Sequence, residues 1–200
     1  MIITVANHKG GVAKTSTVLA IAEIVTYLQK DNPEMLPEEY RQKPVLVIDI
    51  DPQANATEAL GIDPAEVKIS VQQFLEMPEN TVELADVRYG ILKTKFDNIH
   101  LIPSVISIEP YVHRLAGEMD GAMRLSVVVK HLSDRYPLIL VDTPPNLGLF
   151  TQNALVAADG VLVPISLSKH AIMGIQNLMS IIATARYEAS NRAGALESIK

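Results

Sequence analysis

The stretch His8-Lys9-Gly10-Gly11-Val12-Ala13-Lys14-Thr15-Ser16 directly follows the apolar residues 2–6. A strand that breaks into glycines and then into a Lys-Thr pair at the start of a helix is typical of a phosphate-binding loop. In such a loop, backbone N–H groups and the helix N-terminus surround an anion, the lysine reaches the outer phosphates, and the threonine hydroxyl can hold Mg²⁺. The stretch therefore predicts a nucleotide site, while an ordinary Gly-Gly turn with incidental lysines is the plainer alternative.

The loop departs from the usual G-x-x-x-x-G-K-[ST] pattern, because its two glycine positions hold His8 and Ala13. Gly10 and Gly11 remain where the backbone must come close to phosphate and adopt unusual angles. We expect Ala13 to keep a backbone conformation that is open to residues with a Cβ. The loop also has a second lysine, Lys9, near its start. This extra charge narrows the prediction from nucleotide-binding proteins in general to one family.

The composition is that of one globular domain over residues 1–200. Hydrophobic residues make up 48% of the 200 residues and charged residues 20%, which suits a sizeable core. The absence of cysteine excludes a disulfide scaffold, a thiolate metal site and a cysteine-held iron–sulfur cluster. With no basic-plus-apolar leader and no apolar stretch of about 18 residues, we expect a cytosolic soluble protein. The net charge of −6 argues against a constitutively basic nucleic-acid binder but leaves room for a local basic patch.

Short apolar runs alternate with longer helical patterns along the chain. Five runs are nearly all apolar, as expected for parallel strands covered on both faces: residues 2–6, 45–48, 99–102, 138–141 and 161–165. A helical period follows the loop, and another spans 172–182. The alternation predicts an α/β fold, with a doubly wound, mainly parallel sheet and helices on both faces. Residues 29–44 are polar, contain three prolines and predict a surface insertion.

Three aspartates stand where the predicted strands end. Asp49 and Asp51 follow the second strand at i and i+2, so on an extended segment both carboxylates point the same way. Asp142 follows the run 138–141, where an aspartate is the usual partner of a phosphate loop in holding the shell of Mg²⁺. Because ligands in doubly wound sheets lie beyond the carboxyl ends of the strands, we expect all three near the loop. A capping aspartate in a turn is the alternative for each.

Three segments carry a resemblance to a known family: residues 7–15, 49–55 and 142–148. They look like the deviant Walker A, switch I and switch II motifs of the ParA/Soj partition ATPases, within the wider ParA–MinD family of P-loop NTPases. The similarity runs from residue 1 to about residue 182 and also takes in residues 151–159, Val163-Pro164 and a predicted helix around Gly174. The Asp-Pro-Gln-x-Asn element favours the ParA side. Family members usually continue through another strand and helices, so either these elements are absent or the sequence is a shortened form.

The resemblance implies a homodimer in which ATP is sandwiched between the protomers. Lys9 would cross to the partner's nucleotide, neutralise phosphate charge there and tie hydrolysis to dimerisation; a solvated loop lysine is the alternative. Lys14 would hold the β- and γ-phosphates, and Asp51 would position the attacking water. The full set of implied site residues is Lys9, Lys14 and Asp51 for catalysis; Gly10, Gly11, Val12, Ala13, Lys14, Thr15 and Ser16 for the nucleotide; and Thr15, Asp49 and Asp142 for magnesium.

The implied function is DNA segregation driven by ATP and Mg²⁺. Such a protein would bind non-specific DNA as an ATP dimer, in a salt-dependent way, and release it when a ParB-like or other cargo adaptor stimulates hydrolysis. The cargo would be plasmid or chromosomal DNA. The protein would be cytoplasmic and nucleoid-associated in its ATP state, without a membrane partner. Arg186, Arg192 and Lys200 are interspersed with glutamates, which indicates a solvated helix face rather than a DNA-binding stripe.

Other functions of the same fold remain open. A MinD-like membrane-cycling ATPase, or another cargo-positioning ATPase, is the first alternative; the membrane-cycling type needs a terminal basic amphipathic helix, and residues 186–194 lack that pattern. A metabolic ATPase would donate electrons or ligate substrates. The missing cysteines argue against the first activity, and no substrate site for the second can be located in the sequence. A GTPase is disfavoured because no Asn-Lys-x-Asp element occurs.

Overall fold

The computed structural model describes residues 1–77, 84–106, 121–165, 178–184 and 187. The strands in these ranges are β1 (Ile2–Val5), β2 (Val45–Asp49), β3 (Leu92–Lys93), β4 (Ile99–Ile102), β5 (Ile139–Asp142) and β6 (Gly160–Leu162). The α-helices are α1 (Lys14–Asp31), α2 (Asn55–Ala59), α3 (Val71–Glu76), α4 (Leu84–Tyr89), α6 (Arg124–Lys130) and α7 (Leu149–Ala157). Two 3₁₀ turns are η1 (Pro33–Met35) and η2 (Glu38–Tyr40), and residues 178–184 are also helical. The predicted helix around Gly174 and the cations Arg186, Arg192 and Lys200 lie outside the described residues.

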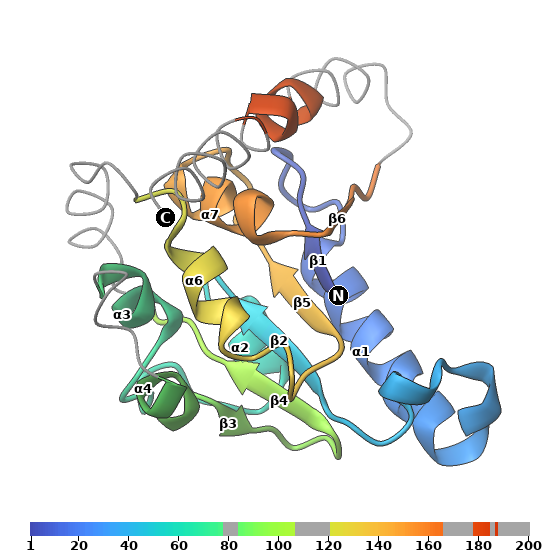
Figure 1. Ribbon diagram of the computed structural model, residues 1–200. Helices are drawn as coiled ribbons and strands as arrows, with labels where there is room; N and C mark the ends of the chain where they lie inside the picture. Colours follow the sequence, from blue (N-terminus) through green and yellow to red (C-terminus); the bar gives the residue numbers. More distant parts are fainter. Residues whose placement is uncertain (78–83, 107–120, 166–177, 185–186, 188–200) are drawn as a thin grey trace, which may run out of the picture.

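Six strands form one sheet in the order β3-β4-β2-β5-β1-β6, and every neighbouring pair is parallel except β3 with β4 (Figure 1). The prediction of a doubly wound, mainly parallel sheet is confirmed. Asp49 at the end of β2 pairs in register with Asp142 at the end of β5. The last strand is shorter than predicted, because Pro164 has no N–H to donate to a neighbour. The edge strand β3 has only two residues, and no apolar run in the sequence predicts it.

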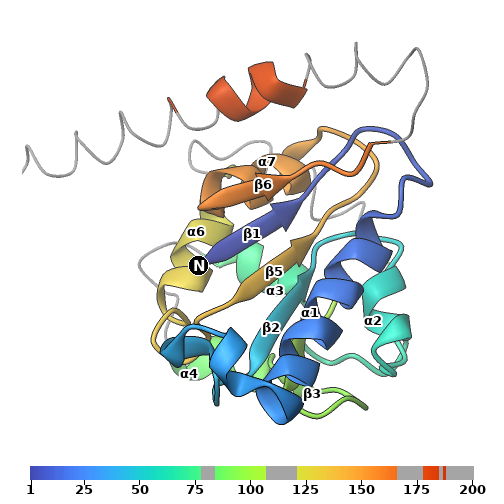
Figure 2. The same ribbon diagram turned by 90° about the vertical axis from the view of Figure 1, so that its right-hand side faces the viewer.

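Different helices cover the two faces of the sheet. Leu46 and Ile48 of β2 contribute to a core that includes residues of α3, α6 and α7, whereas Val45 and Val47 contribute to a core with α1. Every residue of β2 is buried, which explains why this run is continuously apolar rather than alternating. Figure 2 shows α1 and α2 on one side of the sheet, with α6 and α7 on the other. With both faces covered, the ends of the strands are the natural place for a ligand site.

The 18-residue helix α1 begins directly after the loop. Val18 and Ala22 are fully buried against the sheet. In the part of the chain that the structure describes, no helix is both long and apolar enough to cross a membrane. The helix extends into the predicted insertion 29–44, where the Gln29 amide donates to the carbonyl oxygens of Tyr40 (2.5 Å) and Lys43 (2.8 Å). The Tyr40 side chain is buried, so this segment is packed against α1.

Candidate phosphate-binding site

The loop between β1 and α1 makes its last turn at Ala13. Gly11 has φ +70°, and Ala13 has φ 64° and ψ 32°, so both lie in the left-handed region. This small left-handed region is open to residues with a Cβ, as expected for Ala13, although it favours glycine. The turn is needed because the Ala13 carbonyl oxygen accepts the first bonds of α1, from the Thr17 N–H (2.9 Å) and the Thr17 hydroxyl (2.7 Å). The left-handed conformation destabilises the folded loop by about 1 kcal/mol when the residue is alanine, so the loop holds backbone strain at Ala13.

Neighbouring segments hold the loop in place. The Asn7 side chain accepts a hydrogen bond from the Lys9 N–H (3.0 Å) and donates one to the Pro164 carbonyl (2.7 Å), which follows β6. A Cβ on Gly10 would come within 3.8 Å of the Pro145 Cβ, so the loop also lies against the chain that follows β5. Asn7 directly precedes the loop, and no pattern in the sequence assigns its side chain a role. Its two hydrogen bonds fix where the loop begins.

Lys14 is a buried cation among carboxylates. Its side chain is only 7% exposed, and its ammonium lies 3.4 Å from the Lys9 carbonyl oxygen. Burial lowers the pKa of Lys14, while the charges of Asp142 and Asp51 oppose that shift. A cation that has lost most of its water and has carboxylates within electrostatic range is well suited to receive an anion. The structure thus brings Lys14, Asp51 and Asp142 together, as the sequence predicts.

Thr15 and Asp142 join the loop to the end of β5. The Thr15 hydroxyl donates to Asp142 Oδ2 at 2.6 Å. Asp142 is fully buried, and its Oδ1 has no hydrogen-bond partner among the described residues. Burial raises the pKa of Asp142 to about 6; the Thr15 hydrogen bond opposes the shift and the Asp51 charge adds to it. Hydroxyl and carboxylate oxygens are the hard ligands that Mg²⁺ prefers. A buried carboxylate oxygen without a hydrogen-bond partner is costly, and a bound cation would remove that cost. These residues therefore fit a magnesium ion.

Asp49 and Asp51 have different surroundings. The fully buried Asp49 accepts at Oδ2 from the Thr57 N–H (2.8 Å) and hydroxyl (2.7 Å), and at Oδ1 from the Asp51 N–H (3.1 Å). Burial, with the Asp142 charge second, raises the pKa of Asp49 to about 7. Asp51 accepts at Oδ1 from the Gln53 N–H (2.9 Å), and burial raises its pKa while the Lys14 charge opposes this. Asp51 is therefore the residue of the pair that interacts with Lys14.

The remaining loop residues differ in exposure. Val12 is buried, whereas Lys9, Gly10, Gly11 and Ser16 are exposed. Exposure of Lys9 is compatible with a contact to another molecule, and the predicted contact to a partner's nucleotide stays a prediction. Backbone atoms of Lys9 are used within the loop, by Asn7 and Lys14.

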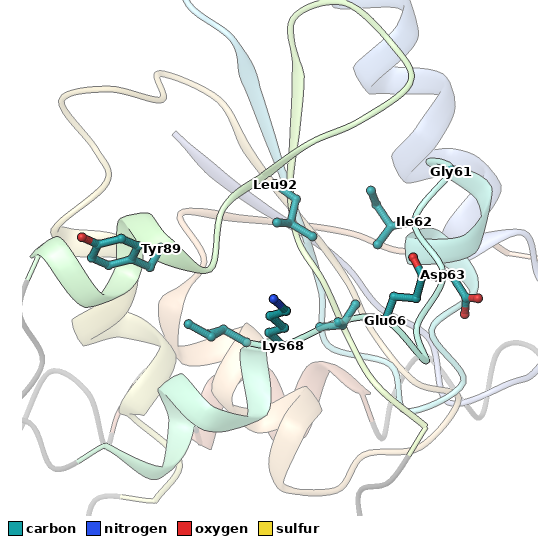
Figure 3. Close-up of a pocket in the computed structure, with 9 residues that line it drawn as sticks. Gly61, Ile62, Asp63, Glu66, Lys68, Tyr89 and Leu92 are labelled. Carbon is teal, nitrogen blue, oxygen red and sulfur yellow. The ribbon is translucent and has the colours of Figure 1, made fainter.

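A separate hollow of about 500 Å³ lies at the opposite end of the sheet, next to β3 (Figure 3). Ile62 and Leu92 line it together with the charged side chains of Asp63, Glu66 and Lys68. The strand order puts three strands between β3 and β1, so this hollow is not part of the phosphate-loop site. None of the residues predicted for nucleotide or magnesium lines it.

Comparisons with known proteins agree with this geometry. Residues 1–193 match the protein family described as an AAA domain. The sporulation initiation inhibitor protein Soj of Bacillus subtilis (strain 168) is 34% identical over 181 residues, which are 90% of this chain and 64% of Soj. The chain thus spans slightly less than two thirds of the length of this relative.

Two solved structures resemble the fold. Cobyrinic acid a,c-diamide synthase from Mycobacterium smegmatis, with a bound ATP analog and magnesium, has a TM-score of 0.76 and 28% identity, covering 93% of this chain and 68% of that one. A plasmid partition protein from Borrelia burgdorferi has a TM-score of 0.68 and 27% identity, covering 93% of this chain and 73% of that one. The same scaffold therefore occurs in proteins whose names indicate different cellular roles.

Proposed function

Because the chain belongs to the AAA domain family and is similar to Soj over most of its length, we propose that it binds ATP with Mg²⁺ at residues 8–16 and hydrolyses ATP to ADP and phosphate. The observation that carries the proposal is the contact of Thr15 with Asp142, whose second oxygen is buried without a partner among the described residues. The ATP analog and magnesium in the synthase structure support this choice of ligands.

Binding uses the loop's N–H groups and Lys14. The N–H groups at the start of α1 surround the phosphates, and the Lys14 ammonium neutralises the β- and γ-phosphates. Burial destabilises the charged form of Lys14, and the negative charge of the phosphates stabilises it again. The Thr15 hydroxyl would hold Mg²⁺, and the carboxylates of Asp142 and Asp49 would support the ion with their charge. When bound, the ion neutralises charge on the transferred phosphoryl group.

Hydrolysis requires a water molecule in line with the bond that breaks. The water oxygen bonds to the γ-phosphorus while the bond from that phosphorus to the β,γ-bridging oxygen breaks. ADP leaves with the bonding electrons, and the water's proton ends on the products. Asp51 orients this water through its carboxylate, which is 5% exposed and held at Oδ1 by the Gln53 N–H. Lys9 of one protomer contributes a positive charge to the nucleotide of the other, which couples turnover to dimerisation.

The cellular role that we propose is segregation of plasmid or chromosomal DNA. The names of Soj and of the Borrelia plasmid partition protein support it. In this role the ATP-bound homodimer binds non-specific DNA, and an adaptor of the ParB type stimulates hydrolysis and releases the protein. In the cell, the ATP form is then associated with the nucleoid in the cytoplasm.

A second candidate is an ATP-dependent ligase, which the sequence also left open. It is favoured by the synthase structure, which has the higher TM-score of the two. Both candidates need the same ATP site. They differ in the molecule that accepts the phosphoryl group and in the partner that controls the transfer. In a partition ATPase the acceptor is water and DNA binding depends on the nucleotide.

Binding to random-sequence duplex DNA tests the partition role. The measurement is made at low and moderate salt, with Mg-ATP and with Mg-ADP. We expect salt-sensitive binding with ATP only, and we expect Lys9→Ala to keep nucleotide binding but to lose both the ATP-dependent dimer in light scattering and the DNA complex. Lys30→Ala, which removes an exposed lysine of α1, serves as the control. DNA binding that ignores the nucleotide, or none in either state, would contradict the partition role and leave the ligase as the better candidate.

A further inference from the structure

Thr57 connects three segments through one buried hydroxyl. It lies on α2, is fully buried, and donates from Oγ1 to Asp49 Oδ2 (2.7 Å). Its backbone N–H donates to the same oxygen (2.8 Å). The hydroxyl oxygen in turn accepts from the Ser104 N–H (3.0 Å), which follows β4. The hydroxyl therefore acts as donor and as acceptor, and its orientation is fixed from both sides.

The other oxygen of Asp49 fixes Asp51. Asp49 Oδ1 accepts from the Asp51 N–H at 3.1 Å, so a single carboxylate bridges Asp51 and Thr57. The chain between them turns sharply, because the Ala54 N–H bonds back to the Asp51 carbonyl (2.9 Å) and Ala54 has φ 53°. A rotation of the Asp49 carboxylate would therefore move the backbone of Asp51. The direct consequence is a shift of the Asp51 side chain beside Lys14.

The same network continues away from the loop. The Gln72 amide of α3 donates to the Ser104 hydroxyl at 2.8 Å, and both side chains are buried. Since Ser104 N–H holds the Thr57 hydroxyl, α3 and the end of β4 form a rigid support behind α2. A positioning group needs such a support, because its own orientation must be fixed before it can fix another.

We propose that the Thr57 hydroxyl is a positioning residue for ATP hydrolysis: by orienting Asp49 it holds Asp51 where the attacking water is bound. The proposal rests on the proposed function, since it concerns the turnover step of the same site. Among the described residues, the hydroxyl of Thr57 bonds to Asp49 and Ser104 and not to the phosphate loop, so we expect nucleotide binding not to depend on it. Turnover does, because small displacements of a water-orienting group reduce the rate strongly.

The test compares three variants with the wild type, measuring kcat for ATP, KM and the Kd of Mg-ATP. Thr57→Val removes the hydroxyl, Thr57→Ser keeps it, and Thr4→Val is the matched control. Thr4 is equally buried, and its hydroxyl donates to the Ala154 carbonyl (2.8 Å) on the far side of the sheet from α2. We expect Thr57→Val to lower kcat by about 10- to 100-fold, with Kd within about threefold of the wild type. Thr57→Ser should recover most of kcat, and Thr4→Val should retain it.

Two results would overturn the proposal: wild-type kcat in Thr57→Val, or a Thr57→Ser variant as slow as Thr57→Val. Thr57→Ala compared with Thr57→Ser gives the same contrast at nearly equal volume if the valine variant does not fold. An equal loss of kcat in Thr4→Val would also overturn the proposal, because removing any buried hydroxyl would then be enough to slow turnover. A wild-type protein that binds Mg-ATP without turnover would instead refute the proposed hydrolysis, and the proposal with it.

Discussion

Asp49 and Asp142 occupy paired positions at the ends of neighbouring strands, yet they have opposite surroundings. Both are fully buried. Asp49 accepts three hydrogen bonds that use both of its oxygens, whereas Asp142 accepts one from Thr15 and has an Oδ1 without a partner among the described residues. The same sequence signature, an aspartate after an apolar run, thus gives one carboxylate that organises the protein and one that can serve a ligand.

The chain that follows each strand explains the difference. After Asp49 the backbone turns through Ala54 into α2, which brings Thr57 back onto the carboxylate. After Asp142 come Thr143 and two prolines, and prolines have no N–H to donate. The Thr143 hydroxyl is used elsewhere, on the Val5 carbonyl (2.8 Å). The Thr143 N–H lowers the pKa of Asp142, yet Asp142 Oδ1 has no partner with hydrogen-bond geometry among the described residues.

The largest expected effect is on magnesium. Asp142→Asn should weaken the Mg²⁺-dependent part of ATP binding by about 10- to 100-fold. The substitution removes the negative charge of the carboxylate that binds the Thr15 hydroxyl and supports the ion. Asp49→Asn should weaken that dependence less, by about threefold at most, because both Asp49 oxygens already accept hydrogen bonds from the protein and Asp49 supports the ion only through its charge. Titration of ATP into each variant with and without Mg²⁺ checks this. Equal losses in the two variants would mean that the contrast between the aspartates has no functional meaning.

The two substitutions should also change stability in opposite directions. In the nucleotide-free protein, Asp142→Asn removes a buried charge and should raise the free energy of unfolding by on the order of 3 kcal/mol at pH 8. Asp49→Asn also removes a buried charge, but it places an amide NH₂ against an N–H donor; we expect the lost hydrogen bonding to outweigh the gain and to lower the free energy of unfolding by about 1 kcal/mol. Urea unfolding in EDTA measures both values. If Asp142→Asn is less stable than the wild type, the charge of Asp142 is compensated in the nucleotide-free wild-type protein.

The stabilisation by Asp142→Asn should depend on pH. The pKa of Asp142 is raised by burial from 3.8 to about 6, so the folded protein holds this proton at pH values where the unfolded chain has released it. The wild type therefore loses stability as pH rises through about 6, and the advantage of the variant grows between pH 4 and 7 and is level above. Urea unfolding of the pair across this range checks the sign. An advantage that shrinks with rising pH would contradict the assignment.

The smallest effects concern the left-handed alanines. Ala13→Gly and Ala54→Gly each relieve a positive φ, which stabilises the folded protein by about 1 kcal/mol. The greater entropy of glycine in the unfolded chain offsets about half of this, so the free energy of unfolding should rise by about 0.5 kcal/mol. Ala56→Gly, on α2 with ordinary helical angles, is the control and should destabilise. Thermal unfolding of the three variants tests this, and equal destabilisation by all three would show that the alanines carry no strain.

Much of the fold and part of the site could be predicted from the sequence. The five parallel strands are predictable because each run is apolar, which in β2 and β5 reflects burial on both faces, while β3 has only two residues and no pattern. The loop motif predicts that Lys14 and Thr15 lie near Asp142. The link between Asp49 and Thr57 has no such signal, because it depends on the left-handed turn at Ala54, which no periodicity encodes. The role of Lys9 depends on a second molecule, so the fold of one chain does not determine it.

The most direct test of the account is calorimetric titration of Mg-ATP into the wild type, Lys14→Ala and the control Lys30→Ala. We predict saturable binding to the wild type and to Lys30→Ala, and its loss in Lys14→Ala. Lys14 is the buried cation that interacts with Asp51 and Asp142, whereas Lys30 is an exposed lysine of the same helix. Wild-type affinity in a folded Lys14→Ala protein would contradict the assignment of residues 8–16 as the nucleotide site.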